Sequence, residues 1–390
     1  MTTNKTQGLV SNGSGTDLVL GRIRELDGWR AISVTLVIIH HLLCFRYSKV
    51  ISGIPLAPHI FWNMGRLGVK VFFVISGFVI CRLLLAEEQR SGSISLRGFY
   101  LRRAFRILPP LLLLLGTIVL LDACGFIRIG WASFAEASAF LADFREPTSW
   151  FLGHTWSLAV EEQFYLLFPA LMLFTPAGRR NFLFGFAFTI CIAWTLILSP
   201  SLKHPLAPDV TRSGFACICF GVVTALNEQR FRAIARRIPI FAIATLAFLL
   251  IIHPPATAST IGFLWDASLT PICISAIILY SLETRGTITS FLCCRPTQIV
   301  GLASYSIYLW QQLLTAPSYA FQKAGPSIAF VVLLSLFAIP GSFFLVEKPA
   351  IRLGRMLLNR DQSTIVDNYR APEIVASSSA TPEKPITLIG

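Results

Sequence analysis

Charged residues are scarce in this chain. Asp, Glu, Lys and Arg make up 14% of its 390 residues, whereas 54% of the residues are hydrophobic. The mean hydropathy is +0.66, and soluble domains carry about 25% charged residues. This composition excludes an ordinary soluble domain and indicates a protein that crosses a membrane several times.

Several other features are missing. There is no cleavable signal pattern, because the first 20 residues are polar and rich in Gly, Ser and Thr, so we expect the first apolar run to be an uncleaved anchor. No internal repeat stands out, and no non-membrane stretch is long enough to form a second core. We therefore predict disordered tails at 1–21 and 356–390 around one membrane domain, 22–355.

The nine cysteines form no Cys-x-x-Cys motif, and most lie in apolar runs. They are predicted to be small buried side chains rather than a disulfide framework, and we expect no metal site. The net charge of +13 does not indicate nucleic acid, because the basic residues flank apolar runs in short segments. That placement is typical of loops that contact membrane lipids on the cytoplasmic side.

Ten apolar runs are candidate membrane spans, which predicts an all-α bundle of about ten transmembrane helices. They are 29–45, 67–86, 106–124, 156–175, 182–199, 212–227, 238–252, 261–281, 299–316 and 327–346. When the connecting segments are assigned to alternate sides, 24 of the 33 basic residues fall on the side of the N-terminus. Because basic residues prefer the inner face, both termini are predicted to be cytoplasmic.

The first span carries Arg30 and, eleven residues later, His41. Eleven residues make three helical turns plus roughly 20°, so the two side chains share one face, roughly 16 Å apart along the axis. Ionisable residues inside a membrane span are costly and usually functional. We expect His41 to act as a base and Arg30 to order a ligand, although a membrane anchor and a packed imidazole would leave the same pattern.

A cluster of three arginines, Arg102, Arg103 and Arg106, precedes Pro109 and Pro110. The prolines are predicted to mark the first turn of a membrane helix, with the arginines at its cytoplasmic mouth. Guanidinium groups at these spacings can bind one polyanion with paired hydrogen bonds. The alternative is an anchor for anionic lipid head groups.

Two acidic residues, Glu161 and Glu162, lie within a later apolar run, and Tyr165 follows Glu161 by one turn. At least one carboxylate should face the bundle interior, either to orient His41, to balance an arginine, or to form a structural ion pair. In an earlier run, Ser76 and Gly77 are predicted to allow close helix packing, with a smooth wall beside a substrate channel as the functional alternative.

Taken in order, these motifs resemble the acyltransferase-3 family of integral membrane O-acyltransferases. The resemblance covers about residues 22–355. It rests on Leu26-Asp-Gly-Trp-Arg30 with His41, Phe72-Phe-Val-Ile-Ser-Gly-Phe78, Arg102-Arg103…Arg106, Trp156-Ser-Leu…Glu161…Phe164-Tyr165, Ser304-Tyr305…Tyr308-Leu-Trp310 and Val346-Glu347-Lys-Pro349. The ordered set is far more specific than any single motif.

The resemblance implies a multi-pass protein of the bacterial inner membrane. Such proteins move an acyl group, usually acetyl from acetyl-CoA, to a hydroxyl of a sugar in a cell-envelope or secreted glycan. The matching positions imply His41, Glu161 and Arg30 as catalytic residues. They imply a set of substrate-binding residues: Arg102, Arg103, Arg106, Tyr165, Trp310 and Glu347.

One position departs from the family, since many members have His where this chain has Gln311. This weakens any mechanism that needs a second base there. The acceptor stays open, and a small secondary metabolite such as a macrolide is an alternative to a glycan. A transporter or flippase of lipid-linked glycan, or a non-catalytic scaffold, would share this composition.

Overall fold

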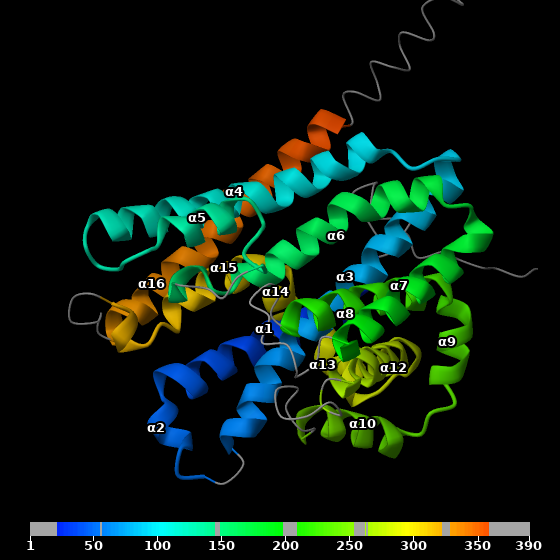
Figure 1. Cartoon of the computed structure of the whole chain (residues 1–390), viewed down its shortest axis with the longest axis horizontal. Coiled ribbons are helices and arrows are strands. Elements are labelled where there is room, and N and C mark those ends of the chain that lie inside the picture. The colour runs from blue at the N-terminus through cyan, green and yellow to red at the C-terminus, as the bar shows by residue number, and fades with distance from the viewer. Residues whose placement is uncertain are drawn as a thin grey trace, which may run out of the picture.

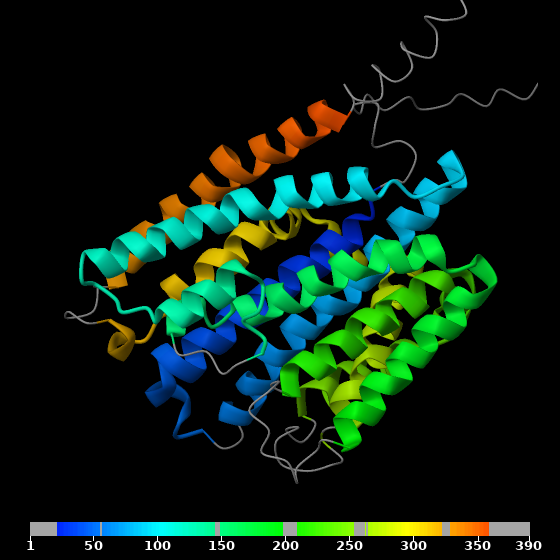
Figure 2. The same ribbon diagram turned by 45° about the horizontal axis from the view of Figure 1, so that its top comes forward.

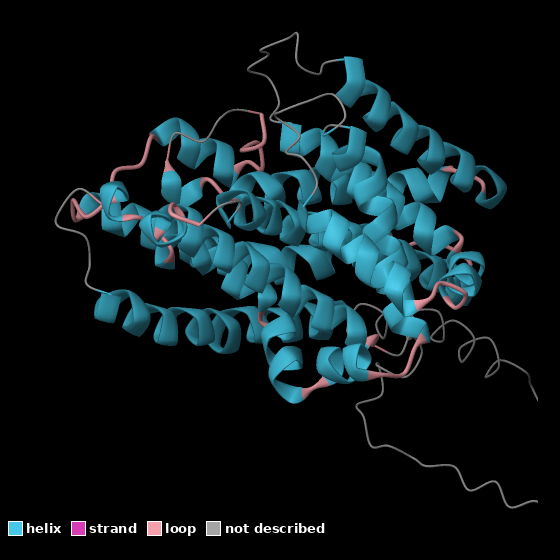
Figure 3. Cartoon of the chain, turned by 90° about the horizontal axis from the view of Figure 1, so that it is seen from below, coloured by secondary structure: helices cyan, strands magenta, loops and turns pink. Residues whose placement is uncertain are grey.

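The structure is a computed structural model that describes residues 22–54, 57–144, 149–197, 209–252, 262, 264–321 and 328–358. These residues form helices joined by loops, with one isolated bridge between Ile127 and Phe321. Figure 3 shows helices and loops alone in this part of the chain, which confirms the all-α class. The tails predicted to be disordered lie outside the described residues, apart from 356–358, which belong to the last helix.

The N-terminal part of the bundle is a helical hairpin. Helix α1 (Arg24–His41) continues into a π-helical turn, η1 (Leu42–Arg46), and the short α2 (Ser48–Ile51) leads into α3 (Ala57–Ser91). Apolar runs as long as those in α1 and α3 can cross a bilayer. Helix α1 lies inside the bundle, packed against α3, α14 and α15 (Figure 1).

Helix α4 (Leu96–Ala123) begins well before Pro109 and Pro110, which lie inside it. The prediction that the prolines mark its first turn is therefore wrong. Ser95 caps the helix by accepting a hydrogen bond from the Gly98 N–H over 3.1 Å, so its start is fixed by a side-chain cap. Neighbouring helices allow a membrane helix to keep internal prolines. The arginine cluster consequently lies on the helix itself.

The remaining elements follow in chain order. They are α5 (Trp131–Ser138), η2 (Trp150–Leu152), α6 (Thr155–Phe174), α7 (Ala177–Ile197), α8 (Asp209–Leu226), α9 (Glu228–Ala235), α10 (Ile240–Ile252), η4 (Trp265–Leu269), α12 (Thr270–Glu283), α13 (Thr287–Cys293), α14 (Arg295–Leu302), α15 (Ser304–Leu314), η5 (Ser318–Ala320), α16 (Ile328–Gly341) and η6 (Ser342–Glu347). A helix continues to residue 358 and runs beside α4 (Figure 2).

In the part of the chain that the structure describes, five helical segments are long and apolar enough to cross a membrane. They are Arg24–Arg46, Ala57–Ser91, Leu96–Ala123, Trp150–Phe174 and Trp265–Glu283. A sixth is possible if α9 and α10, which meet at 107°, count as one broken span. The chain is therefore a multi-pass helical membrane protein, while the number ten and the side of each terminus stay predictions. The predicted run 299–316 is interrupted at Ala303, between α14 and α15.

Helices α3 and α8 pack closely against each other through two glycines. A Cβ atom at Gly77 would lie 2.1 Å from the Ile218 carbonyl oxygen, and one at Gly221 would lie 2.3 Å from the Val74 oxygen. Small residues allow such backbone approach in membrane bundles. The predicted close packing at Gly77 is thus confirmed, and it fixes the position of the neighbouring Ser76.

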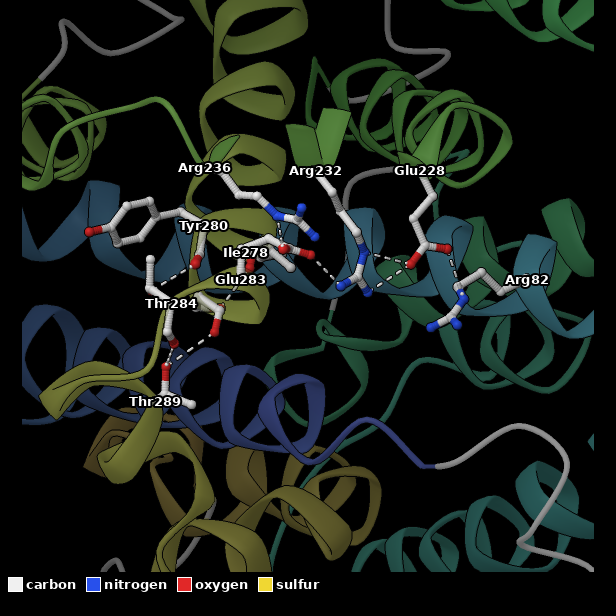
Figure 4. Close-up of polar contacts among 10 residues, drawn as sticks. Arg82, Glu228, Arg232, Arg236, Ile278, Tyr280, Glu283, Thr284 and Thr289 are labelled. Atoms are coloured by element: carbon white, nitrogen blue, oxygen red, sulfur yellow. Dashed lines mark hydrogen bonds and ion pairs between the residues drawn. The ribbon is translucent and has the colours of Figure 1, made fainter. Parts of the chain in front are cut away.

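A chain of ion pairs fixes α9 against two longer helices (Figure 4). Glu228 of α9 pairs with Arg82 of α3 at 3.0 Å and with Arg232 at 2.7 Å. Arg232 also pairs at 2.6 Å with Glu283, at the end of α12, and Arg236 pairs with the same carboxylate. The network ties the bent pair α9–α10 to the rest of the bundle.

Candidate functional site

A partly open cavity of about 70 Å³ lies where α1, α3, α4, α6 and α15 meet. Its lining residues are Arg30, Val69, Phe72, Phe73, Ser76, Arg103, Arg106, Ile107, Ser157, Leu158, Glu161, Tyr165, Ser304, Tyr305 and Tyr308. Five residues predicted from the sequence as site residues are therefore brought together, namely Arg30, Arg103, Arg106, Glu161 and Tyr165. We call this space the arginine cavity.

Arg103 is held against an aromatic ring. Its guanidinium carbon lies 3.7 Å from the centre of the Tyr165 ring, which is a cation–π contact. Arg103 also interacts electrostatically with Glu161 and Glu162. The contact orients the planar guanidinium, which can then present its remaining N–H groups to a ligand.

Glu161 joins two motifs that lie far apart in the sequence. Its Oε1 accepts a hydrogen bond from the Ser76 hydroxyl over 2.5 Å, and its charge interacts with Arg103, Arg30 and Arg106. The serine of the Phe72–Phe78 motif therefore holds the carboxylate of the Trp156–Tyr165 motif in place. We find Ser76 to be a polar contact of the site, and not only a small residue for packing.

Glu347 supplies a second carboxylate to the same group of charges. It is buried, and its Oε2 accepts a hydrogen bond from the Ser306 hydroxyl over 2.6 Å. Its charge interacts with Arg106 and Arg30. The three arginines of the cavity are thus opposed by carboxylates, as buried charges require.

Two of the predicted substrate-binding residues lie elsewhere. Arg102 pairs with Glu87 at 3.0 Å, and its side chain is 48% exposed. Trp310 is buried in the apolar cluster formed with α4 and the segment around Phe151. Neither residue lines the arginine cavity. Adjacent arginines on a helix point about 100° apart, so one of them can face the cavity while the other faces outward.

His41 lies at the other end of α1 from Arg30 and does not line the cavity. The two residues share a helix face with Val34 and Val37, which are buried between them. The Nδ1 atom of His41 is 3.0 Å from the Val37 carbonyl oxygen. A protonated Nδ1 that donates to this oxygen leaves the Nε2 lone pair free to accept a proton.

Aromatic rings surround His41. The ring centres of His40, Trp150 and Phe45 lie 4.9, 5.7 and 5.9 Å from its own ring centre. His154, at the N-terminus of α6, is close enough to interact with His41 electrostatically. His154 was missed as a site residue, although its spacing of seven residues from Glu161 places both on one face of α6.

A buried ion cluster on the far side of His40 was likewise not predicted from the sequence. Arg66 and Lys70 of α3 pair with Asp266 at 2.6 and 2.5 Å, and Arg66 interacts electrostatically with His40. Asp266 lies in the π-helical turn η4. The turn η1 follows His41 directly, and the turn η6 ends at Glu347. Such π-helical insertions are frequent at functional sites.

Within the described residues, no group of three or more His, Cys, Asp and Glu side chains is placed to hold a metal ion. The fold and the site define a helical membrane protein with a partly open cationic cavity and a histidine further along one of its helices.

The chain belongs to the acyltransferase-3 family. The profile of this family, described as "Acyltransferase domain", matches residues 23–347. The chain is similar to O-acetyltransferase OatA from two Staphylococcus aureus strains, NCTC 8325 / PS 47 and COL, with 27% identity over 370 residues in each case. The alignment covers 84% of this chain and 57% of each relative, so the chain spans less than two thirds of their length. No solved structure matches it.

Proposed function

We propose that this protein is an acyl-CoA-dependent O-acyltransferase of the bacterial inner membrane. It transfers an acyl group, most simply acetyl, to a sugar hydroxyl of an envelope or secreted glycan. The main support is the arrangement on α1, where Arg30 lines a cationic cavity and His41 follows on the same face. Membership of the family and the likeness to O-acetyltransferases support the same reaction type.

The arginine cavity suits the anionic donor. Arg30, Arg103 and Arg106 present guanidinium groups to one space, and guanidinium forks match phosphate oxygens. The cavity, at about 70 Å³, is much smaller than the roughly 300–1,000 Å³ of a typical ligand pocket. The cavity as it stands therefore holds only part of coenzyme A, and the half-exposed Arg102, near the N-terminal end of α4, is placed to meet the phosphates first.

His41 is the base in this proposal. Its Nε2 takes the proton of the acceptor hydroxyl as the hydroxyl oxygen attacks the thioester carbonyl, and the C–S bond breaks to release the coenzyme A thiolate. A covalent route, in which Nε2 first receives the acyl group and then passes it to the acceptor, uses the same atom. Glu161 balances the arginine charges in both routes. No resident metal or cofactor is required for either step.

The two ends of α1 also fit the two substrates in space. Coenzyme A is a cytoplasmic compound, and the positive-inside bias assigns both termini and the arginine cluster to the cytoplasmic side. The loop that carries Trp150 and His154 then lies toward the outer side, where glycan acceptors would meet His41. Ten spans with both termini inside complete this topology.

The test uses inverted membrane vesicles that contain the protein or an empty-vector control. Labelled acetyl-CoA is added, and O-acetyl groups on extracted glycans are identified by NMR. We expect label on a glycan from the vesicles that carry the protein and not from the control. Movement of a lipid-linked glycan without consumption of acetyl-CoA would instead support a flippase, and label on a small metabolite alone would change the acceptor class.

A further inference from the structure

The face of α15 that lines the arginine cavity continues beyond it. Ser304, Tyr305 and Tyr308 line the cavity, and at 100° per residue Gln311 and Gln312 fall on the same face one turn later. Helices α1 and α15 are in register here, because Arg30 and Ser304 line one cavity and Arg46 donates to the Ala316 carbonyl over 2.6 Å. The two glutamines therefore lie at about the level of His41.

Gln311 is one of the buried residues whose side-chain polar atoms have no hydrogen-bond partner among the described residues. Its side chain is 1% exposed, and neither its amide nitrogen nor its amide oxygen has a hydrogen-bond partner there. Buried polar atoms are almost always paired, either within the protein, with ordered water or with a ligand. A buried and unpaired amide at about the level of His41 points to a partner that comes from outside the chain.

His154 reaches the same place from α6. Its ring is 4% exposed and lies beside the Gln312 side chain and the Leu309 backbone, with neither ring nitrogen in a well-formed hydrogen bond. The Tyr308 hydroxyl donates to the His154 carbonyl over 3.1 Å, which fixes α6 to α15 at this point. The neighbouring imidazole of His41 is close enough to interact electrostatically.

Trp150 closes this group on one side. Its indole N–H donates to the Gln312 carbonyl over 2.9 Å, and its ring meets His41 edge-on and packs against Phe45 at 4.8 Å between centres. The indole is therefore held rigidly between Gln312 and His41. A flat aromatic surface next to amide groups gives a binding site one apolar wall and one polar wall.

We propose that His154, Gln311 and Gln312 form the acceptor-hydroxyl subsite, which binds neighbouring hydroxyl groups of a sugar next to His41. Amides and neutral imidazoles both donate and accept hydrogen bonds, as hydroxyl groups do, and none of these groups carries the full charge that a phosphate would need. Arg30, Arg103 and Arg106 line the arginine cavity instead. This subsite rests on the proposed function. It specifies where the acceptor binds and that amide and imidazole groups hold it by hydrogen bonds.

The experiment compares Gln311→Leu with the wild type in two assays. The first is the KM for the acceptor, with the de-O-acetylated glycan fraction of the expression host as substrate and acetyl-CoA saturating. The second is the unfolding temperature of purified protein with and without that glycan. We expect Gln311→Leu to raise the glycan KM about tenfold, in line with the loss of roughly one or two hydrogen bonds, and to abolish stabilisation by the glycan. The KM for acetyl-CoA should stay unchanged.

Gln163→Leu is the matched control. The Gln163 amide donates to Asp143 and to the Phe140 carbonyl over 2.8 and 2.9 Å, so its loss should lower the unfolding temperature and leave the glycan KM unchanged. Leucine at 311 replaces unpaired atoms and should not lower the unfolding temperature without glycan. A lower unfolding temperature with an unchanged glycan KM would show that Gln311 is structural and overturn the subsite.

The two proposals can fail separately. If the wild type acetylates the glycan and Gln311→Leu keeps the wild-type KM, the subsite is wrong and the proposed function stands. If the wild type transfers no acetyl group but is stabilised by the glycan, and Gln311→Leu is not, the subsite stands and the reaction is wrong. Without glycan stabilisation of the wild type, the subsite is wrong in either case.

Discussion

Substitution of Gly77 by alanine tests the packing that positions the site. The added Cβ would lie 2.1 Å from the Ile218 carbonyl oxygen, whereas ordinary contacts begin at 3.4 Å. Helices α3 and α8 must therefore separate by about 1.3 Å at this point, because a backbone oxygen cannot rotate away. Overpacking of this kind costs about 1–3 kcal/mol, occasionally more.

The same substitution should also reduce activity. Ser76 is the preceding residue, and its hydroxyl donates to Glu161 over 2.5 Å. A shift of about 1 Å lengthens this hydrogen bond beyond its useful range, and misplacements of that size can lower rates about 100-fold. We expect Gly77→Ala to unfold at a lower temperature in detergent and to lose most acyl transfer.

Gly116→Ala is the control for this prediction. Gly116 lies within α4, and nothing would lie within 4 Å of an added Cβ there. Alanine favours helix by up to about 1 kcal/mol over glycine, so this variant should be as stable as the wild type or more stable. Equal stability and activity of Gly77→Ala and the wild type would refute the α3–α8 contact described here.

Three further predictions follow from single contacts. Arg103→Lys loses the planar contact with Tyr165 and should weaken coenzyme A binding at least tenfold. Arg102→Lys changes an exposed ion pair worth about 1 kcal/mol or less, so its coenzyme A affinity should stay within a factor of about three of the wild-type value. Equal effects of the two substitutions would contradict the assignment of Arg103 to the cavity and Arg102 to the surface. Asp266→Asn removes the carboxylate that Arg66 and Lys70 share and should cost about 3–5 kcal/mol of stability, as measured by unfolding in detergent, and an unaffected variant would rule out the buried ion cluster. Glu347→Gln removes a negative charge near Arg106 and should tighten coenzyme A binding in a titration with the purified protein, while weaker binding would mean that the carboxylate orients the arginines.

The sequence was sufficient to predict much of the arginine cavity. Arg30, Arg103, Arg106, Glu161 and Tyr165 were each singled out, and they meet in one place. The reason is physical, because an ionisable group in an apolar helix must face the interior and find an opposite charge. The face shared by Arg30 and His41 likewise follows from helical periodicity alone.

Other features depend on contacts between distant segments and could not be predicted in this way. Arg102 and Arg103 are adjacent, and only the position of Glu87 on α3 shows which of them turns outward. Asp266 meets Arg66 across 200 positions of sequence, and its π-helical turn has no signature in hydrophobic periodicity. The prolines of α4 were assigned to a helix start by a preference of soluble helices, but membrane helices tolerate them inside.

In the proposed function, His41 performs the chemistry for a donor that the arginine cavity holds. The most direct measurement is the rate of acetyl transfer from labelled acetyl-CoA by purified wild-type and His41→Ala proteins, with their unfolding temperatures and coenzyme A affinities measured in parallel. We predict a loss of at least about 100-fold in transfer, with coenzyme A affinity and unfolding temperature close to those of the wild type. A His41→Ala protein that folds normally and transfers acetyl groups at the wild-type rate would contradict the account.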